Sequence, residues 1–230
     1  MNRFRQFLES EKKKILELEG KSRYQYIWQY YKLWIIAFCC LVFMIGYVGH
    51  HVRNTLSDHW FYITFVSTWA DVGNGSELWD GYVDYSGYDT SEKLIDFNNE
   101  SYFDYTKNHA QGNTYYELCV AHIESATLDA ITMKTEEIVL FGETGRFLDL
   151  DSEECQSIKE KYGDRFVYCT PLDEEYESDH VAVGIDITDS ILMEKYHLYE
   201  EGSTCALAIG EYSQHLEAVE KFLDYIFEEE

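Results

Sequence analysis

The chain has 230 residues, of which 46% are hydrophobic and 27% are charged, and its formal net charge at pH 7 is -25. This hydrophobic content is enough for a packed core and excludes a wholly disordered chain, and a single proline with 14 glycines excludes collagen-like and linker-like classes. So acidic a chain is repelled by phosphate backbones, which argues against nucleic-acid binding as its main function.

The charge is distributed unevenly along the chain. Residues 1–32 contain eight basic and four acidic side chains, a net charge of +4, and subtracting this from -25 leaves -29 on residues 33–230. At the border, residues 33–49 (LWIIAFCCLVFMIGYVG) contain no Asp, Glu, Lys, Arg or His. Aromatic residues occur at both ends of this run, as they do at membrane interfaces, and Lys32 can reach the lipid headgroups.

We interpret residues 33–49 as a single transmembrane helix. A cleaved signal peptide would place its basic stretch within the first few residues, whereas here 32 residues precede the apolar run. The excess of basic residues before the run predicts a cytoplasmic tail over residues 1–32, in contact with the lipid bilayer of the cell membrane, a linker over residues 50–59 and an extracellular domain over residues 60–230. The alternative is a buried core helix.

The extracellular part alternates between strand and helix patterns, which is typical of a three-layer α/β domain. Six segments are predicted as strands, namely Trp60–Thr68, Lys93–Phe97, Leu128–Met133, Arg165–Thr170, His180–Asp186 and Thr204–Ile209. Helices are predicted between them. Ser76 is expected to cap the first, and Thr114 with Glu117 forms a capping box for the second.

Three later segments are also predicted to be helical. One covers residues 135–141, and a second begins at Asp151 or Ser152 and ends near Gly163. The third covers residues 213–228 and carries an apolar stripe at helical spacing, formed by Leu216, Val219, Phe222, Leu223, Ile226 and Phe227.

The order of these segments resembles the amino-terminal lobe of the type II extracellular solute-binding proteins of bacterial ABC importers. The segments that carry the resemblance are WFYITFVST, ELWDGYVDYSGYDTSEKLIDF, LDAITM and EEIVLFGETGRFLDLD. Within the last of them, the family's G-x-hydrophobic-hydrophobic-D-L pattern is matched by Gly145, Phe147, Leu148, Asp149 and Leu150. The end of the chain resembles the family's closing strand and E-A-x-x-F-L-x-Y helix, matched by Glu217, Ala218, Phe222, Leu223 and Tyr225.

The resemblance implies one lobe of a two-lobed fold, because the roughly 45 residues between the GRFLDLD segment and the closing strand are too few for a second lobe. The arrangement is similar to single-pass membrane proteins of Firmicutes whose outer part is a reduced lobe. We therefore expect an accessory or scaffold protein that docks on another membrane protein, such as an importer. The alternative is a receptor that captures a small sugar or peptide on the open surface of the lobe.

Ligands of open α/β sheets bind beyond the carboxyl ends of the strands. Residues predicted at these ends are Ser67, Thr68, Trp69, Thr132 and Lys134, and they form the candidate ligand site. An exposed Trp69 could stack on a sugar or a peptide. A buried core tryptophan is the other reading of the same residue.

The sequence contains no pattern that predicts catalysis or a cofactor. Residues 142–146 lack the Lys-Ser/Thr pair of a P-loop, and neither G-x-S-x-G nor H-E-x-x-H occurs. Two acidic clusters, at residues 149–154 and 173–179, could hold calcium, but neither has the register of an EF-hand loop, so we predict no metal site. The four cysteines after the apolar run allow three disulfide pairings, between which spacing cannot choose.

Overall fold

The computed structural model describes residues 20, 28–29, 32–33, 36–44, 46, 59–172 and 180–228. The chain divides into two units, Met1–Ser57 and Asp58–Glu230. In the first unit, residues 36–44 are helical and carry exposed apolar side chains such as Phe38 and Phe43. The rest of the predicted transmembrane segment lies largely outside the described residues. Within the described part of the chain, no helix is both long enough and apolar enough to cross a membrane.

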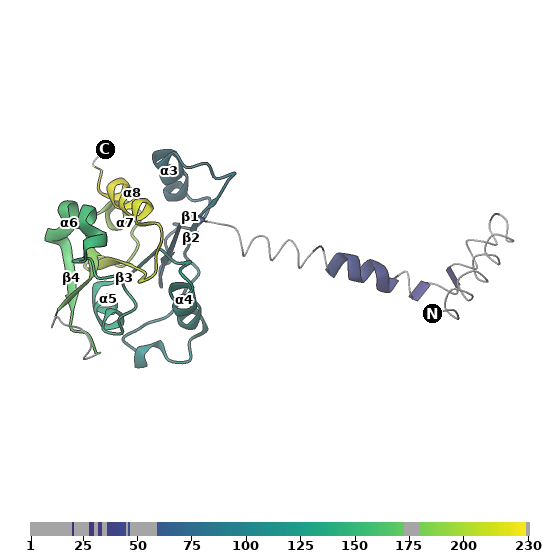
Figure 1. Cartoon of the computed structure of the whole chain (residues 1–230), viewed down its shortest axis with the longest axis horizontal. Coiled ribbons are helices and arrows are strands. Elements are labelled where there is room, and N and C mark those ends of the chain that lie inside the picture. Colours follow the sequence, from purple (N-terminus) through teal and green to yellow (C-terminus); the bar gives the residue numbers. More distant parts are fainter. Residues whose placement is uncertain are drawn as a thin grey trace. The chain divides into compact units, whose positions relative to one another are not determined.

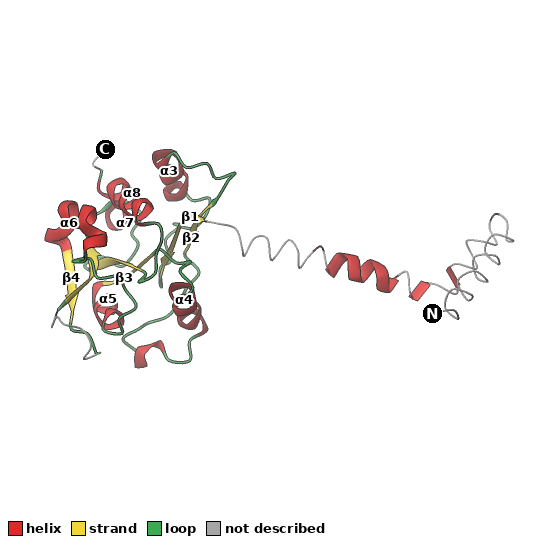
Figure 2. Ribbon diagram, in the orientation of Figure 1, coloured by secondary structure: helices red, strands yellow, loops and turns green. Residues whose placement is uncertain are grey.

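The second unit is built on one six-stranded mixed sheet (Figures 1 and 2). Its strands are β1 (His59–Phe65), β2 (Leu94–Asn98), β3 (Ala130–Lys134), β4 (Phe166–Cys169), β5 (Val181–Asp186) and β6 (Cys205–Ile209). They lie in the order β2-β1-β3-β6-β5-β4. β1 is parallel to both β2 and β3, whereas β6 runs antiparallel to its neighbours β3 and β5, and β4 is antiparallel to β5. All six predicted strands are therefore confirmed.

Helices connect the strands. They are α3 (Glu77–Ser86), α4 (Thr114–Glu124), α5 (Thr135–Gly142), α6 (Gln156–Tyr162), α7 (Ile191–Glu194) and α8 (Leu216–Phe227), with 3-10 turns η1 (Asn108–Ala110), η2 (Glu153–Cys155) and η3 (Gly163–Arg165). The short α7 was not predicted from the sequence.

The alternation of side chains along β1 explains why helices cover both faces of the sheet. Phe61, Ile63 and Phe65 point to one face, where they pack with apolar residues of α3, α6, α7 and α8. Tyr62, and Val66 directly after the strand, point to the opposite face, where α4 and α5 supply the partners. Figure 1 shows α3, α7 and α8 on one side of the sheet and α4 and α5 on the other. The domain is thus an α/β fold in three layers.

The stripe on the last helix is confirmed as core. Phe222 in α8 is fully buried, and its ring centroid lies 5.3 Å from that of Phe61, 5.4 Å from Tyr82 and 5.5 Å from Phe97. The hydroxyl of Tyr82 donates a 2.9 Å hydrogen bond to the carbonyl oxygen of Ala218, so the polar end of this buried ring is satisfied. One aromatic cluster therefore ties α3 and α8 to β1 and β2.

The predicted helix caps are partly right. Ser76 caps α3 as expected, because its hydroxyl accepts a hydrogen bond from the N–H of Trp79. The capping box at Thr114 is wrong: the cap of α4 is Asn113, whose side-chain oxygen accepts from the N–H groups of Tyr115 and Tyr116. An asparagine one residue earlier satisfies the same free N–H groups, which leaves Thr114 inside the first turn.

Candidate functional site

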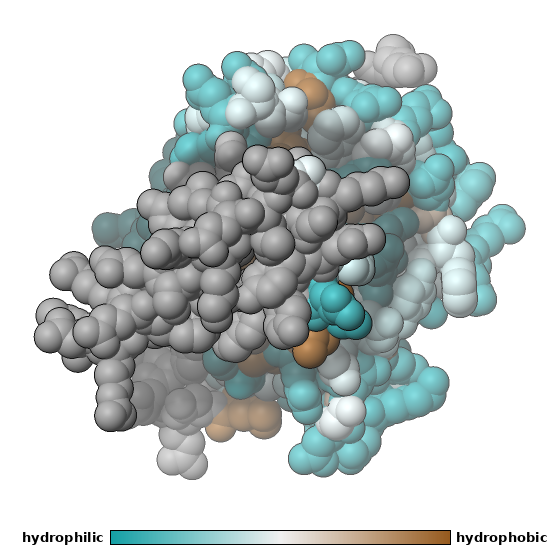
Figure 3. All heavy atoms as spheres, turned by 90° about the vertical axis from the view of Figure 1, so that its right-hand side faces the viewer, coloured by the Kyte–Doolittle hydropathy of each residue, from teal (hydrophilic) through white to brown (hydrophobic). Residues whose placement is uncertain are grey.

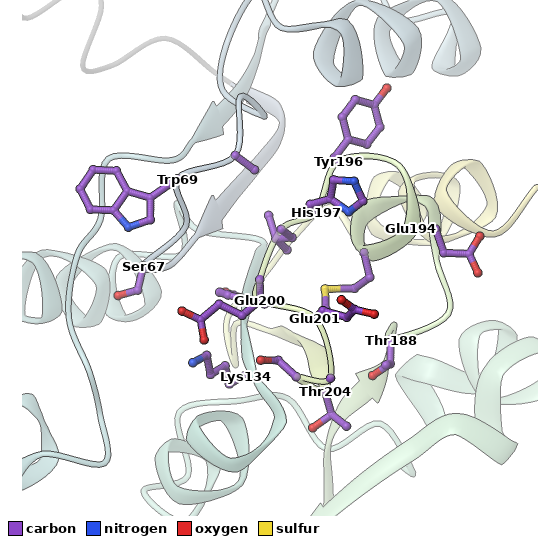
Figure 4. Close-up of a pocket in the computed structure, with 16 residues that line it drawn as sticks. Ser67, Trp69, Lys134, Thr188, Glu194, Tyr196, His197, Glu200, Glu201 and Thr204 are labelled. Atoms are coloured by element: carbon purple, nitrogen blue, oxygen red, sulfur yellow. The ribbon is translucent and has the colours of Figure 1, made fainter.

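An open basin of about 960 Å³ lies at one edge of the sheet (Figure 4). It is lined by Ser67 and Trp69 after β1, Lys134 at the end of β3, Thr188 after β5, and most of residues 193–204, which lead into β6. Since β6 is antiparallel to its neighbours, its first residues lie at the same edge as the carboxyl ends of β1, β3 and β5. The basin is therefore where open α/β sheets place their ligands.

Tyr199 forms part of the wall where the basin meets the sheet. Its hydroxyl donates hydrogen bonds of 2.7 Å to the carbonyl oxygen of Val66 and 3.2 Å to that of Thr132. Val66 directly follows β1 and Thr132 lies within β3, so the hydroxyl of Tyr199 bridges the two chain segments. Burial raises the pKa of this hydroxyl well above its usual range, which keeps it protonated and able to donate.

The turn after β1 directs the chain out of the sheet. Ser67 has a φ of 54°, in the left-handed region that non-glycine residues rarely adopt. Its hydroxyl donates a 2.6 Å hydrogen bond to the carbonyl oxygen of Phe103 and accepts one of 3.1 Å from the N–H of the same residue. The reciprocal pair of bonds holds the turn in this conformation, and Trp69 projects from it.

Trp69 is 91% exposed, so the reading of this residue as a core tryptophan is wrong. Its ring lies 5.3 Å from the ring of Tyr102, which in turn lies 6.2 Å from that of Tyr115 at the start of α4. Tyr102 and Tyr115 are 36% and 45% exposed. We refer to Trp69, Tyr102 and Tyr115 as the aromatic ridge. The ridge meets the basin at Trp69, which belongs to both.

The charged side chains of the basin are mostly acidic. Glu194, Glu200 and Glu201 line it, all three are exposed, and Lys134 is the one lysine or arginine among the described residues that does so. In Figure 4, Ser67 and Trp69 lie on one side of the basin and Thr188 and Glu194 lie on the other. Elsewhere, Figure 3 shows hydrophilic residues over most of the described surface that it presents.

The structure brings together three of the five predicted site residues. Ser67, Trp69 and Lys134 line the basin. Thr68 is buried and uses its hydroxyl structurally, donating a 2.6 Å hydrogen bond to the carbonyl oxygen of Leu198. Thr132 is fully buried within β3.

The sequence analysis missed the entire wall formed by residues 193–204, including Tyr199 and the glutamate pair Glu200 and Glu201. These residues are more than 120 positions from Trp69, and nothing local in the sequence shows that β6 runs antiparallel. The direction of that strand is the fact that brings its leading loop to this edge of the sheet.

A second polar cluster lies at the opposite edge of the sheet. The fully buried Asp129 accepts hydrogen bonds from the N–H of Tyr62 and the hydroxyl of Ser213, and His215 Nδ1 lies 3.1 Å from its Oδ1. Ser213 therefore bonds to the carboxylate and not to the imidazole, which is not the arrangement of a serine nucleophile and its base. The cluster joins β1 to the start of α8.

The acidic clusters considered for calcium are only partly described. At the first, Asp151 forms a 2.9 Å ion pair with Lys159, and Asp149 accepts a hydrogen bond from the N–H of Asp151. The second, residues 173–179, lies outside the described residues. Among the described residues, no three His, Cys, Asp or Glu side chains come together in a group that could hold a metal ion.

The four cysteines of the domain are free thiols. Cys119, Cys155, Cys169 and Cys205 are each at most 3% exposed. Burial raises the pKa of Cys119 and of Cys169 to about 11, and it raises the pKa of Cys205 well above its usual range. Each thiol packs as a small apolar side chain.

Comparison with known proteins yields no relative: no family model, no curated protein and no solved structure matches the chain.

Proposed function

We propose that the chain is a non-catalytic, membrane-anchored binding protein whose α/β domain docks on another membrane protein, such as an ABC importer. The observation that carries this proposal is the almost fully exposed side chain of Trp69. The turn at Ser67 holds Trp69 in place, and Trp69 lies between the basin and the other two residues of the aromatic ridge. Contiguous exposed apolar patches mark interaction sites, and aromatic side chains are enriched where proteins bind one another.

The openness of the basin favours a macromolecular partner over a small solute. Tight binding of a small molecule requires burial of roughly 70–90% of its surface. The basin is open to solvent at the edge of a single sheet, so it offers a small molecule little enclosure. A protein partner can instead cover the basin and the ridge together, since about 800 Å² from each side is a usual interface area.

A second candidate function is the capture of a small sugar or peptide. The observation that favours it is the position of Trp69 at the edge of a cavity of about 960 Å³, because an exposed indole can stack on a sugar ring. A ligand screen separates the two functions. Docking predicts that the full chain in detergent shows no thermal shift with millimolar sugars, neutral amino acids or neutral di- and tripeptides. A shift of several degrees with one solute, lost in Trp69→Ala, would instead establish a receptor.

Membrane anchoring and family membership belong to the same proposal. The apolar run at residues 33–49 and the basic residues before it support a cell-membrane protein with a cytoplasmic amino terminus. The segments that resemble a solute-binding-protein lobe fall on β1, α3, β2, β3, α5, β6 and α8, in that chain order, which supports the interpretation as a single lobe.

Site-specific photocrosslinking in intact membranes tests the docking proposal. A photoreactive residue at Trp69 or Tyr102 should give the same single adduct, identified by mass spectrometry. The control position is Glu153, which is exposed and lies at the opposite edge of the sheet, since the preceding Leu148 and Leu150 donate hydrogen bonds to Ile209 and Ala182 there. Equal adducts from Glu153 and Trp69 would contradict docking through the basin and the ridge.

A further inference from the structure

We infer that the partner contributes a basic segment, bearing arginine or lysine side chains, that lies across the basin and covers Trp69. The inference rests on the proposed docking function and specifies its chemistry. Two independent features of the described domain lead to it, namely the carboxylates of the basin and the uncovered indole ring.

The first feature is a set of basin carboxylates that pair with no described cation. Glu194, Glu200 and Glu201 line the basin, and none of the three forms an ion pair with a described residue. The neighbouring Lys195 does not compensate them, because it pairs at 2.9 Å with Glu77 on α3. Together with Lys134, the lining carries a net charge of -2 when His197 is neutral, in a concave site where the fields of like charges add.

The second feature is that Trp69 has no cation over its ring among the described residues. Elsewhere in the described domain, aromatic rings are covered by the chain's own cations: Lys93 lies 5.0 Å from the ring of Trp60, Lys221 lies 4.4 Å from Tyr88, and Arg165 lies 4.5 Å from Phe227. Trp69 is the most exposed large hydrophobic side chain of the described residues, yet no described cation covers it. Tryptophan binds cations more strongly than the other aromatic side chains, and arginine is the more common partner.

The two features are suited to one extended occupant. Trp69 and Ser67 lie on one side of the basin and Glu194 lies on the other, so an occupant that contacts both has to extend across the basin (Figure 4). A peptide with basic side chains along its length can place one over the indole and others near the carboxylates. Lys134 disfavours a basic group at the end of β3, which restricts where the segment's charges can lie.

Titration of the full chain in non-ionic detergent with an alternating Gly-Arg octapeptide tests the inference. We expect saturable binding that weakens at least tenfold in the double variant Glu200→Gln/Glu201→Gln and about fivefold or more in Trp69→Ala. The matched control is Glu153→Gln/Glu154→Gln, which removes a glutamate pair that is also exposed but lies at the opposite edge, and it should change the dissociation constant less than twofold. Binding should weaken as salt is raised, because the attraction is electrostatic.

Several outcomes would overturn the inference. An absence of binding, or equal weakening by the two glutamate pairs, would mean that the basin does not select basic segments. Binding of spermidine as tight as that of the octapeptide would assign the site to small cations instead. The photocrosslinking experiment tests the proposed function independently of this inference. A single adduct from Trp69 without octapeptide binding would reject the inferred basic character of the partner and would still support docking.

Discussion

The hydroxyl of Tyr199 donates a 2.7 Å hydrogen bond to the carbonyl oxygen of Val66, the residue directly after β1. Tyr199→Phe leaves this buried carbonyl without its partner, so we expect the free energy of unfolding to fall by about 1–3 kcal/mol. Chemical denaturation of the full chain in detergent measures the change. The control Tyr115→Phe alters an exposed tyrosine and should be neutral. Equal stability of the Tyr199 variant would show that this bond contributes nothing to the fold.

Phe222 tests the aromatic cluster beneath α8. Truncation of a buried phenylalanine to alanine costs about 3–5 kcal/mol, and burial of an unpaired carboxylate costs more. We therefore expect Phe222→Ala to be strongly destabilised and Phe222→Asp to lose its cooperative melt. Glu217→Ala, on the exposed face of the same helix, should stay within about 0.5 kcal/mol of the wild type. A normal melt for Phe222→Asp would exclude this face from the core.

Glu137 is expected to make stability depend on pH. It is 7% exposed, and burial raises the pKa of its carboxyl group, although a 2.9 Å hydrogen bond from the N–H of Tyr105 opposes the shift. A group whose pKa is raised by folding stabilises the fold at pH values below its pKa in the unfolded chain, which is about 4.3 for glutamate. That stabilisation is lost as the pH rises through the pKa of the group in the folded chain.

The neutral variant Glu137→Gln should therefore gain stability relative to the wild type between pH 5 and pH 7.5. Urea denaturation at both pH values gives the difference. Glu136→Gln, which changes the exposed neighbouring glutamate, controls for the overall charge. A difference between Glu137→Gln and the wild type that is the same at both pH values would contradict the assignment.

The four buried thiols predict slow chemical modification of the native domain. In a Cys39→Ser/Cys40→Ser background, a thiol reagent should label none of Cys119, Cys155, Cys169 and Cys205 until denaturant is added, because burial disfavours both access and the reactive thiolate. Counting labels by mass spectrometry before and after denaturation checks this. Rapid labelling of one cysteine in the native state would show that the fold opens locally at that position.

The membrane topology can be tested with two epitopes. Protease added to intact cells should remove an epitope at the carboxyl terminus and spare one at residue 1, because the basic residues lie before the apolar run. Western blots of treated and of permeabilised cells make the comparison. Protection of the carboxyl-terminal epitope in intact cells would place the domain in the cytoplasm.

The strands could be predicted because their composition is a local property: β1 and β6 are apolar on both faces, as strands covered by two helical layers must be. The exposure of Trp69 could not be predicted, because it depends on a left-handed turn at Ser67 that is held by Phe103, 36 residues away. Glu200 and Glu201 resemble any solvated acidic pair in sequence. Only the direction of β6 brings them to the edge that holds Trp69.

The central place of β6 in the sheet also determines how the domain can fold during synthesis. β3 and β5 each pair with β6 along one lateral side. The backbone groups on that side therefore stay unpaired until the ribosome has delivered β6, the last strand of the sheet. β6 begins about 70 residues after β3 ends, an interval of roughly 4–14 s at ordinary elongation rates. An exposed apolar edge is a template for pairing with other chains. The nascent domain therefore has to be kept from aggregating until β6 inserts between the two strands already made.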